Sequence, residues 1–264
     1  MIQRTAEVVS PKHPDKLCDR VSDAILDLFL EKDPLVRCAV ETCGGHGKLF
    51  ITGEITYYGP VIEESQIKNI AKIITGIEPE NVTLNIVAQS PEIAQGVDTG
   101  GAGDQGIMIG YACNDNEEYI PQEYYLARKL NREIYKAYPY DGKTQVTIAG
   151  KNVSIVASFQ MAPKSALERI CKTFAKTEKL KIKSLHCNPA GDWKLGGFDA
   201  DAGVTGRKLA VDNYGPRVPL GGGAFSGKDA TKVDRSAAYM ARYIAVDLLK
   251  KKKAEEVFVE LSYA

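Results

Sequence analysis

The chain has 264 residues, of which 44% are hydrophobic and 26% are charged. This composition is ordinary for a soluble globular protein with one large core or two to three small domains. The formal net charge is zero, so no overall field attracts nucleic acid. No apolar stretch is long enough to span a bilayer, and the N-terminus lacks a signal-peptide core. The sequence therefore predicts a soluble, cytoplasmic protein that binds neither membranes nor nucleic acid.

A run of apolar side chains with helical spacing marks residues 15–32, and Asp33-Pro34 ends it. The elements predicted next are strands at 35–43 and 48–58, a helix near 63–75 and a strand at 81–88. The order of this first unit is therefore α, β, β, α, β.

The same order of elements occurs again further along the chain. The second copy consists of a strand at 106–112, a helix at 121–138, strands at 143–149 and 152–160, a helix at 163–177 and a strand at 183–187. A third copy begins with a helix at 234–250 and a strand at 256–263, where the sequence ends. We therefore predict an α+β fold of repeated ββαβ-type units in domains 1–100, 101–195 and 196–264. The unpaired side of the last strand indicates oligomerisation.

Six cysteines are scattered along the chain without a CxxC pair. Cys38, Cys43 and His46 offer only three zinc ligands, and Cys38 lies in a segment that is typical of a strand. Buried free thiols are therefore favoured over a zinc site. The lysine run at 250–253 ends a predicted helix, where cations complement the helix dipole, and is interpreted as a solvated helix terminus.

Two long segments, 89–106 and 188–229, are rich in Gly, Pro, Asp and Asn and have no regular pattern. Long irregular loops in compact domains are usually functional or disordered. Asp, Lys and Arg recur among the glycines of both segments, which favours function.

The segment GGGAFSGKDATKVDRSAAYMARY at 221–243 leads from a glycine-rich loop into a helix. Glycines let the backbone approach a ligand, and the first amides of a helix favour anions. Lys228, Lys232 and Arg235 add positive charge, and Asp234 is a potential ligand for a divalent metal. Asp229 stands where a Walker A motif needs Ser or Thr. Phosphate binding is favoured over a plain solvated loop.

Three shorter motifs are ambiguous when each is taken alone. KHPDK at 12–16 presents His13 and Asp15, an acid and a hard-metal ligand, or simply a helix cap beside a surface histidine. GAGDQG at 101–106 offers Asp104 to an amino group or a metal, or forms a plain turn. TGRK at 205–208 offers Arg207 and Lys208 to an anion, or an ordinary surface pair.

Taken together, these motifs resemble one family, the S-adenosylmethionine synthetases. KHPDK, GEIT (53–56), QSPEIAQGVD (89–98), GAGDQG, DGKTQVT (141–147), TGRK and GGGAFSGKDATKVDRSAAYMARY stand in the order found there. The resemblance covers essentially the whole chain and implies three similar domains related by pseudo-threefold symmetry, the third truncated. It implies a methionine adenosyltransferase with ATP and L-methionine as substrates and Mg²⁺ and K⁺ as cofactors. It also implies a homodimer with active sites at the subunit interface, and leaves open whether dimers pair into tetramers.

The resemblance implies a reaction in which the methionine sulfur attacks C5′ of ATP and expels tripolyphosphate, which is then hydrolysed to phosphate and diphosphate. His13 would hydrogen-bond the departing oxygen, and Asp15 and Asp234 would each hold Mg²⁺, with Glu41 at the K⁺ site. The residues implied to bind phosphate are Lys143, Arg207, Lys208, Lys228 and Lys232. Asp141, Asp201 and Trp193 would bind the nucleoside, and Glu54, Gln89 and Asp104 would bind methionine under a gate loop from Gln89 to Gly101.

Four features depart from the family pattern. Lys12 replaces the glycine before His-Pro-Asp, the gate loop is short, and Trp193 stands where a phenylalanine usually stacks on adenine. The sequence also ends at Ser262-Tyr263-Ala264, where relatives continue and supply part of the methionine pocket. A minimal synthetase is the leading hypothesis. The alternatives are a Mg²⁺-dependent tripolyphosphatase and a silent regulatory subunit that pairs with a full-length relative.

Overall fold

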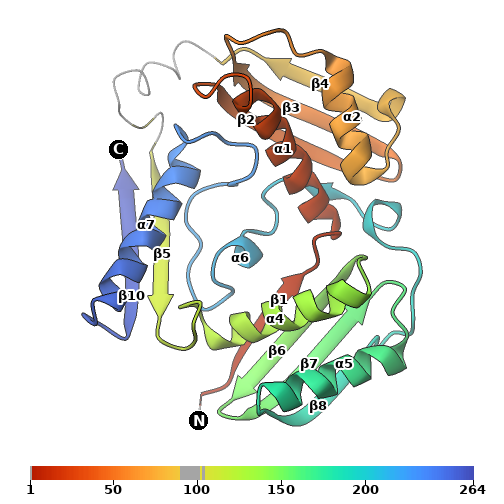
Figure 1. The fold of residues 1–264 in the computed structure, drawn as a ribbon, viewed down its shortest axis with the longest axis vertical. Coiled ribbons are helices and arrows are strands. Elements are labelled where there is room, and N and C mark those ends of the chain that lie inside the picture. The colour runs from red at the N-terminus through yellow and green to blue at the C-terminus, as the bar shows by residue number, and fades with distance from the viewer. Residues whose placement is uncertain (1, 90–101, 103–104) are drawn as a thin grey trace.

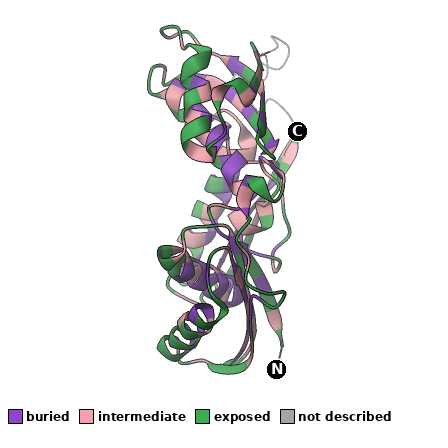
Figure 2. Cartoon of the chain, turned by 90° about the vertical axis from the view of Figure 1, so that its right-hand side faces the viewer, coloured by how far each residue is buried: buried purple, intermediate pink, exposed green. Residues whose placement is uncertain are grey.

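The computed structural model describes residues 2–89, 102 and 105–264. Three separate β-sheets carry their helices on one side, as Figure 1 shows. In the side view of Figure 2, buried residues gather where helices and strands face one another. No helix among the described residues is long and apolar enough to cross a membrane. The predicted α+β fold class is confirmed.

The first sheet has the strand order β4-β3-β2-β9 and carries α1 and α2. Its strands are β2 (Arg37–Gly45), β3 (Lys48–Thr56), β4 (Val82–Val87) and the short β9 (Gly203–Val204), and its helices are α1 (Pro14–Leu30) and α2 (Glu64–Thr75). The pair β2–β3 is antiparallel and β3–β4 is parallel. A short 3-10 helix, η1 (Pro79–Asn81), leads into β4.

The second sheet has the order β1-β6-β7-β8 and carries α4 and α5. Its elements are β1 (Arg4–Val9), β6 (Gly142–Ala149), β7 (Asn152–Phe159), β8 (Lys181–Cys187), α4 (Gln122–Ala137) and α5 (Lys164–Thr177). Again an antiparallel pair, β6–β7, precedes a parallel one, β7–β8. The first two units thus share one pairing pattern, while a threefold relation of all three units stays a prediction.

The third sheet contains β5 (Gly106–Cys113) and β10 (Glu256–Tyr263), covered by α7 (Val233–Lys250). The strand predicted at 106–112 to open the second unit was therefore assigned to the wrong sheet. Each sheet contains one antiparallel pair whose two strands lie far apart in the sequence: β9 with β2, β1 with β6 and β5 with β10. The strand β1 was not predicted at all. These pairings tie the three units to one another.

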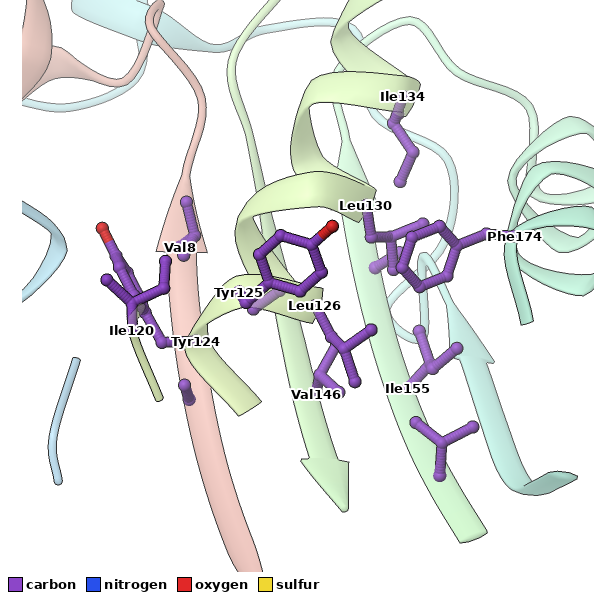
Figure 3. Close-up of a cluster of buried hydrophobic side chains, with 14 of the residues drawn as sticks. Val8, Ile120, Tyr124, Tyr125, Leu126, Leu130, Ile134, Val146, Ile155 and Phe174 are labelled. Carbon is purple, nitrogen blue, oxygen red and sulfur yellow. The ribbon is translucent and has the colours of Figure 1, made fainter. Parts of the chain in front are cut away.

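The largest hydrophobic core lies between α4, α5 and the second sheet. Figure 3 shows Leu126, Leu130 and Ile134 of α4 pointing toward Val146 and Ile155 of the sheet. A second core joins α1 and α2 to the first sheet. Helix α1 places Leu17, Val21 and Ile25 on its buried stripe and begins at Pro14, whose missing N–H is not needed at a helix start. The long segment between β8 and α7 contains only η2 (Gly197–Asp199), β9 and α6 (Leu209–Asp212) as regular elements.

Strand periodicity separates the candidate zinc ligands. Cys38 is buried and Cys43 is exposed, because residues of odd and even number in β2 project to opposite faces. The expectation of buried free thiols therefore holds for five cysteines and is wrong for Cys43.

Gly110 allows α7 to lie directly against β5. A Cβ atom at this position would lie 2.1 Å from the carbonyl carbon of Ala241, a backbone atom that cannot rotate away. We expect Gly110→Val to lower the free energy of unfolding by about 1–3 kcal/mol through overpacking. Urea unfolding measures this change, with the half-exposed Ile107→Val of the same strand as control. Equal stabilities of the two variants would contradict the close contact.

Candidate active site

One face of α1 organises the glycine-rich segment that follows β8. Asp15, Asp19 and Asp23 are spaced by four residues, which aligns them along the helix. The carboxylate Oδ1 of each accepts a backbone N–H from the segment that starts at β9. The donors are Val204 (2.9 Å, to Asp15), Gly206 (2.8 Å, to Asp19) and Gly227 (3.0 Å, to Asp23). Asp19 and Asp23 were missed by the sequence analysis, although their spacing within DKLCDRVSD was a visible signal.

The first charged cluster is centred on Asp15, which is fully buried. Its Oδ2 lies 2.5 Å from Lys208 Nζ, and its Oδ1 lies 2.9 Å from Arg207 Nε. Burial alone would raise the pKa of Asp15, but the Lys208 and Val204 hydrogen bonds and the charges of Lys208 and Arg207 hold it below its ordinary value. Asp15 is thus an ionised carboxylate between two cations, and the structure brings together three of the predicted site residues.

His13 lies at the N-cap of α1, where its Nδ1 accepts the Asp15 N–H at 3.2 Å. Only 5% of the residue is exposed. Burial lowers the pKa of His13 to about 4, and the charges of Lys208 and Lys143 act in the same direction against those of Asp15 and Asp201. The imidazole is therefore neutral at physiological pH, and because Nδ1 accepts a hydrogen bond, Nε2 carries the proton.

This depressed pKa predicts a pH-dependent stability. In the unfolded chain a histidine titrates near 6.5, whereas the folded His13 titrates near 4. Between these values the unfolded state binds the additional proton, so stability is full above pH 6.5 and is lost as the pH falls toward 4. The whole effect amounts to about 3 kcal/mol. Denaturant unfolding at several pH values in metal-free buffer measures it, and His13→Gln should flatten the profile. An unchanged slope in that variant would assign the effect to other groups.

Four further predicted residues lie around His13 or near the start of β6. Lys143 is half-exposed on β6, opposite Val9 of β1, with its Nζ 4.0 Å from Glu7 Oε1. Asp141 accepts the Gly197 N–H at 3.0 Å, and burial raises its pKa. The half-buried Trp193 packs against Gly196, where a Cβ would lie 2.7 Å from the indole ring. Asp201 is exposed.

The second charged cluster lies where the glycine-rich loop enters α7. Lys228 Nζ lies 2.6 Å from Asp234 Oδ2, and the Gly223 N–H donates to Asp234 Oδ1 at 2.7 Å. These two hydrogen bonds and the charge of Lys228 outweigh the effect of burial and lower the pKa of Asp234. Lys232 Nζ lies 3.1 Å from Asp229 Oδ1. The proposed metal-binding carboxylate and the proposed phosphate-binding lysine are again paired with each other.

Both clusters adjoin the same edge of β2. Val204, which binds Asp15, pairs with Cys43, and Lys228 forms a bridge with Ala39. Four strand residues span about 13 Å, so the backbones that carry the two clusters are separated by about that distance.

The residues predicted for methionine and potassium lie on or beside the first sheet. Glu41 of β2 stands opposite Thr52, and Glu54 of β3 stands opposite Ala39. Both carboxylates are exposed on the sheet face away from α1. Gln89 follows β4, and its buried Oε1 has no hydrogen-bond partner among the described residues. Asp104 and residues 90–101 of the predicted gate loop lie outside the described residues.

Similarity to known proteins extends along the whole chain. Family models of the S-adenosylmethionine synthetase N-terminal, central and C-terminal domains match residues 2–99, 99–193 and 195–264. The S-adenosylmethionine synthases of Pelagibacter ubique and Clostridium tetani are each 40% identical to the chain over 98% of its length, which covers 77% and 78% of theirs. A solved structure of an unusual S-adenosylmethionine synthetase from Campylobacter jejuni superposes with a TM-score of 0.86 at 32% identity, covering 100% of this chain and 78% of that one. The chain therefore belongs to the S-adenosylmethionine synthetase family, the metal-dependent transferases that make S-adenosylmethionine from ATP and methionine.

Proposed function

We propose that the clusters around Asp15 and Asp234 bind the triphosphate of ATP while its adenosyl group is transferred to methionine. A lone pair of the methionine sulfur forms the bond to C5′ as the C5′–O5′ bond breaks, and the electron pair leaves with the triphosphate. The sulfur carries no proton, so no general base is needed. The growing charge on the leaving group is the main barrier, and preorganised cations lower it. The observation that carries this proposal is the pairing of Arg207, Lys208 and Lys228 with carboxylates that suit a metal.

The donor chemistry of the two aspartates fits Mg²⁺. Their lowered pKa values keep both ionised, and Mg²⁺ prefers one or two carboxylates together with substrate phosphates over an all-protein cage. Within the described part of the chain no group of three or more His, Cys, Asp or Glu side chains is placed to hold a metal, which suits a site completed by ATP. Asp15 and Asp234 would each hold one Mg²⁺, and a bound Mg²⁺ supplies charge stabilisation to the departing oxygens.

The remaining roles are those that the family resemblance implies. His13, neutral and with its proton on Nε2, would bond the departing O5′. Lys143 and Lys232 would add charge to the phosphates, and Asp141, Asp201 and Trp193 would surround the nucleoside. Glu54, Gln89 and Asp104 would bind methionine, whose ammonium group suits carboxylates. Glu41 would contribute one oxygen to a K⁺ site that needs further donors.

The outer face of the first sheet supports a homodimer. Phe50 and Val87 are 42% and 54% exposed on the sheet face that none of the described helices covers, and Glu41 and Glu54 lie on the same face. An exposed apolar face of this kind marks an interaction surface. A second copy seated there would close the methionine and potassium sites, and the active site would then lie between subunits.

The variant Phe50→Glu tests this face. A charge in the apolar contact should dissociate the dimer, with a dissociation constant at least about tenfold higher, since burial of an unpaired charge is costly. Sedimentation velocity measures the change. Ile73→Glu, on the exposed side of α2, is the control and should remain dimeric. A wild-type protein that is active as a monomer would contradict the proposal.

The activity itself is tested by incubating the pure protein with ATP, L-methionine, Mg²⁺ and K⁺ and detecting S-adenosylmethionine by mass spectrometry. Product is expected, and it should be lost when Mg²⁺ or methionine is omitted. Hydrolysis of added tripolyphosphate, with no S-adenosylmethionine formed from ATP and methionine, would instead indicate a tripolyphosphatase.

A further inference from the structure

The ion pair between Asp23 of α1 and Arg235 of α7 contacts the backbone of Gly227 and Lys228. Asp23 Oδ1 accepts the Gly227 N–H at 3.0 Å and Arg235 Nη1 at 3.0 Å. The same Nη1 donates to the Lys228 carbonyl oxygen at 3.0 Å. The pair therefore binds the backbone on both sides of the Lys228 Cα: Asp23 binds the Gly227 N–H before it, and Arg235 binds the Lys228 carbonyl oxygen after it. The proposed function assigns neither side chain to substrate: Arg235, one of the three cations noted in the sequence of this segment, binds Asp23 instead.

The opposite side of the segment is held by β2. The Val40 N–H donates to the Gly227 carbonyl at 3.1 Å, and the Asp229 N–H donates to the Cys38 carbonyl at 3.2 Å. A Cβ on Gly227 would lie 2.1 Å from the Val40 carbonyl oxygen, and its φ is +77°, so only glycine fits this close approach. With β2 on one side and the Asp23–Arg235 pair on the other, residues 227–229 have little freedom to move.

The same pair also fixes the partner of Lys228. Arg235 follows Asp234 in the first turn of α7, so its bond to Asp23 ties the start of that helix to α1. Lys228 Nζ reaches Asp234 Oδ2 at 2.6 Å. A lysine side chain has a flexible four-carbon stem and loses considerable rotamer entropy when it is fixed. By holding the backbone of Lys228 rigid, the protein fixes the point from which this side chain extends before phosphate binds.

We infer that Asp23 and Arg235 are positioning residues that set Lys228 for phosphate binding. The inference rests on the proposed phosphate-binding role of Lys228. It predicts that removing the pair weakens phosphate binding only when Lys228 is present, which a merely structural role would not produce.

A double-mutant cycle tests this, with imidotriphosphate as a non-hydrolysable probe and its affinity measured by calorimetry in Mg²⁺ buffer. Asp23→Ala should weaken binding about tenfold in the wild-type background and less than about twofold in the Lys228→Ala background. Arg235→Gln removes the charge of the other partner and should weaken binding in the same way. Asp23→Asn keeps the side-chain volume and is the second variant should Asp23→Ala melt below the assay temperature.

The control is Asp247→Ala. Asp247 also lies on α7 in an ion pair, with Lys251 at 2.8 Å, and its side chain is 37% exposed, the same fraction as that of Asp23. This variant should bind imidotriphosphate like the wild type. Equal losses from Asp23→Ala in both backgrounds, or no loss in either, would overturn the inference alone. Unchanged binding by Lys228→Ala would overturn the proposed role of Lys228 and the inference with it.

Discussion

Replacing Asp15 by asparagine is expected to lower the rate of S-adenosylmethionine formation by about 10²–10³-fold, the usual size of losing one preorganised electrostatic contact at a reacting centre. The asparagine Oδ1 can still accept the Val204 N–H, so the link between α1 and β9 is retained. The negative charge between Arg207 and Lys208 is lost, and with it the proposed metal ligand. The side chain keeps its size in a fully buried position, so packing is preserved.

Synthesis assays by mass spectrometry, combined with thermal melting, measure this result. The control is Asp27→Asn, on the same helix three turns further on, where the residue is exposed. It should leave both rate and melting temperature unchanged. Near-normal turnover of Asp15→Asn would contradict the assignment of Asp15 to the reaction, and a collapse in melting temperature would show that its role is structural.

Local patterns predicted most of the helices and strands because their signals lie within one element. The apolar stripe of α1 and the alternation of β2 each follow from their own residues. Strand β1 was missed because its partner, β6, lies more than a hundred residues away in sequence. The assignment of β5 to the wrong sheet has the same cause, since its partner β10 is the last strand of the chain. Non-local pairing leaves no mark in either strand alone.

The motifs name residue types for the candidate site but do not show which side chains pair with one another. The motifs indicated carboxylates and cations near phosphate, and the structure brings Asp15 to Lys208 and Asp234 to Lys228. The Asp15–Lys208 pair joins two motifs and depends on how β9 docks on β2, which neither motif encodes alone, whereas Lys228 and Asp234 lie six residues apart in one motif. The Asp19 and Asp23 contacts to loop amides were predictable in principle, since a four-residue spacing of aspartates on a helix is visible in the sequence.

Asp234→Asn is expected to change two measurements in opposite directions. In the ligand-free protein Asp234 neutralises Lys228 at 2.6 Å, so the lysine must exchange this partner for phosphate when substrate and metal enter. Removing the charge releases Lys228, and binding of imidotriphosphate without Mg²⁺ should tighten by about tenfold, in keeping with the strength of a charge-assisted hydrogen bond. Synthesis with Mg²⁺ should fall by about 10²–10³-fold, because the carboxylate proposed to hold the metal is gone.

Calorimetry in EDTA gives the first quantity, and product formation with Mg²⁺ gives the second. Asp229→Asn is the control, because Asp229 also pairs with a lysine, Lys232. It differs from Asp234 in two ways: it accepts the Cys38 N–H at 2.7 Å, which anchors the loop, and it is not proposed to bind metal. Asp229→Asn should therefore show a smaller gain in metal-free affinity for imidotriphosphate and a smaller loss of synthesis than Asp234→Asn. Weaker metal-free binding by Asp234→Asn would mean that the carboxylate orients Lys228 toward phosphate and does not compete for it. The proposal that Lys228 leaves Asp234 to bind phosphate would then be wrong. The matching test for the Asp15–Lys208 pair is the same measurement on Asp15→Asn.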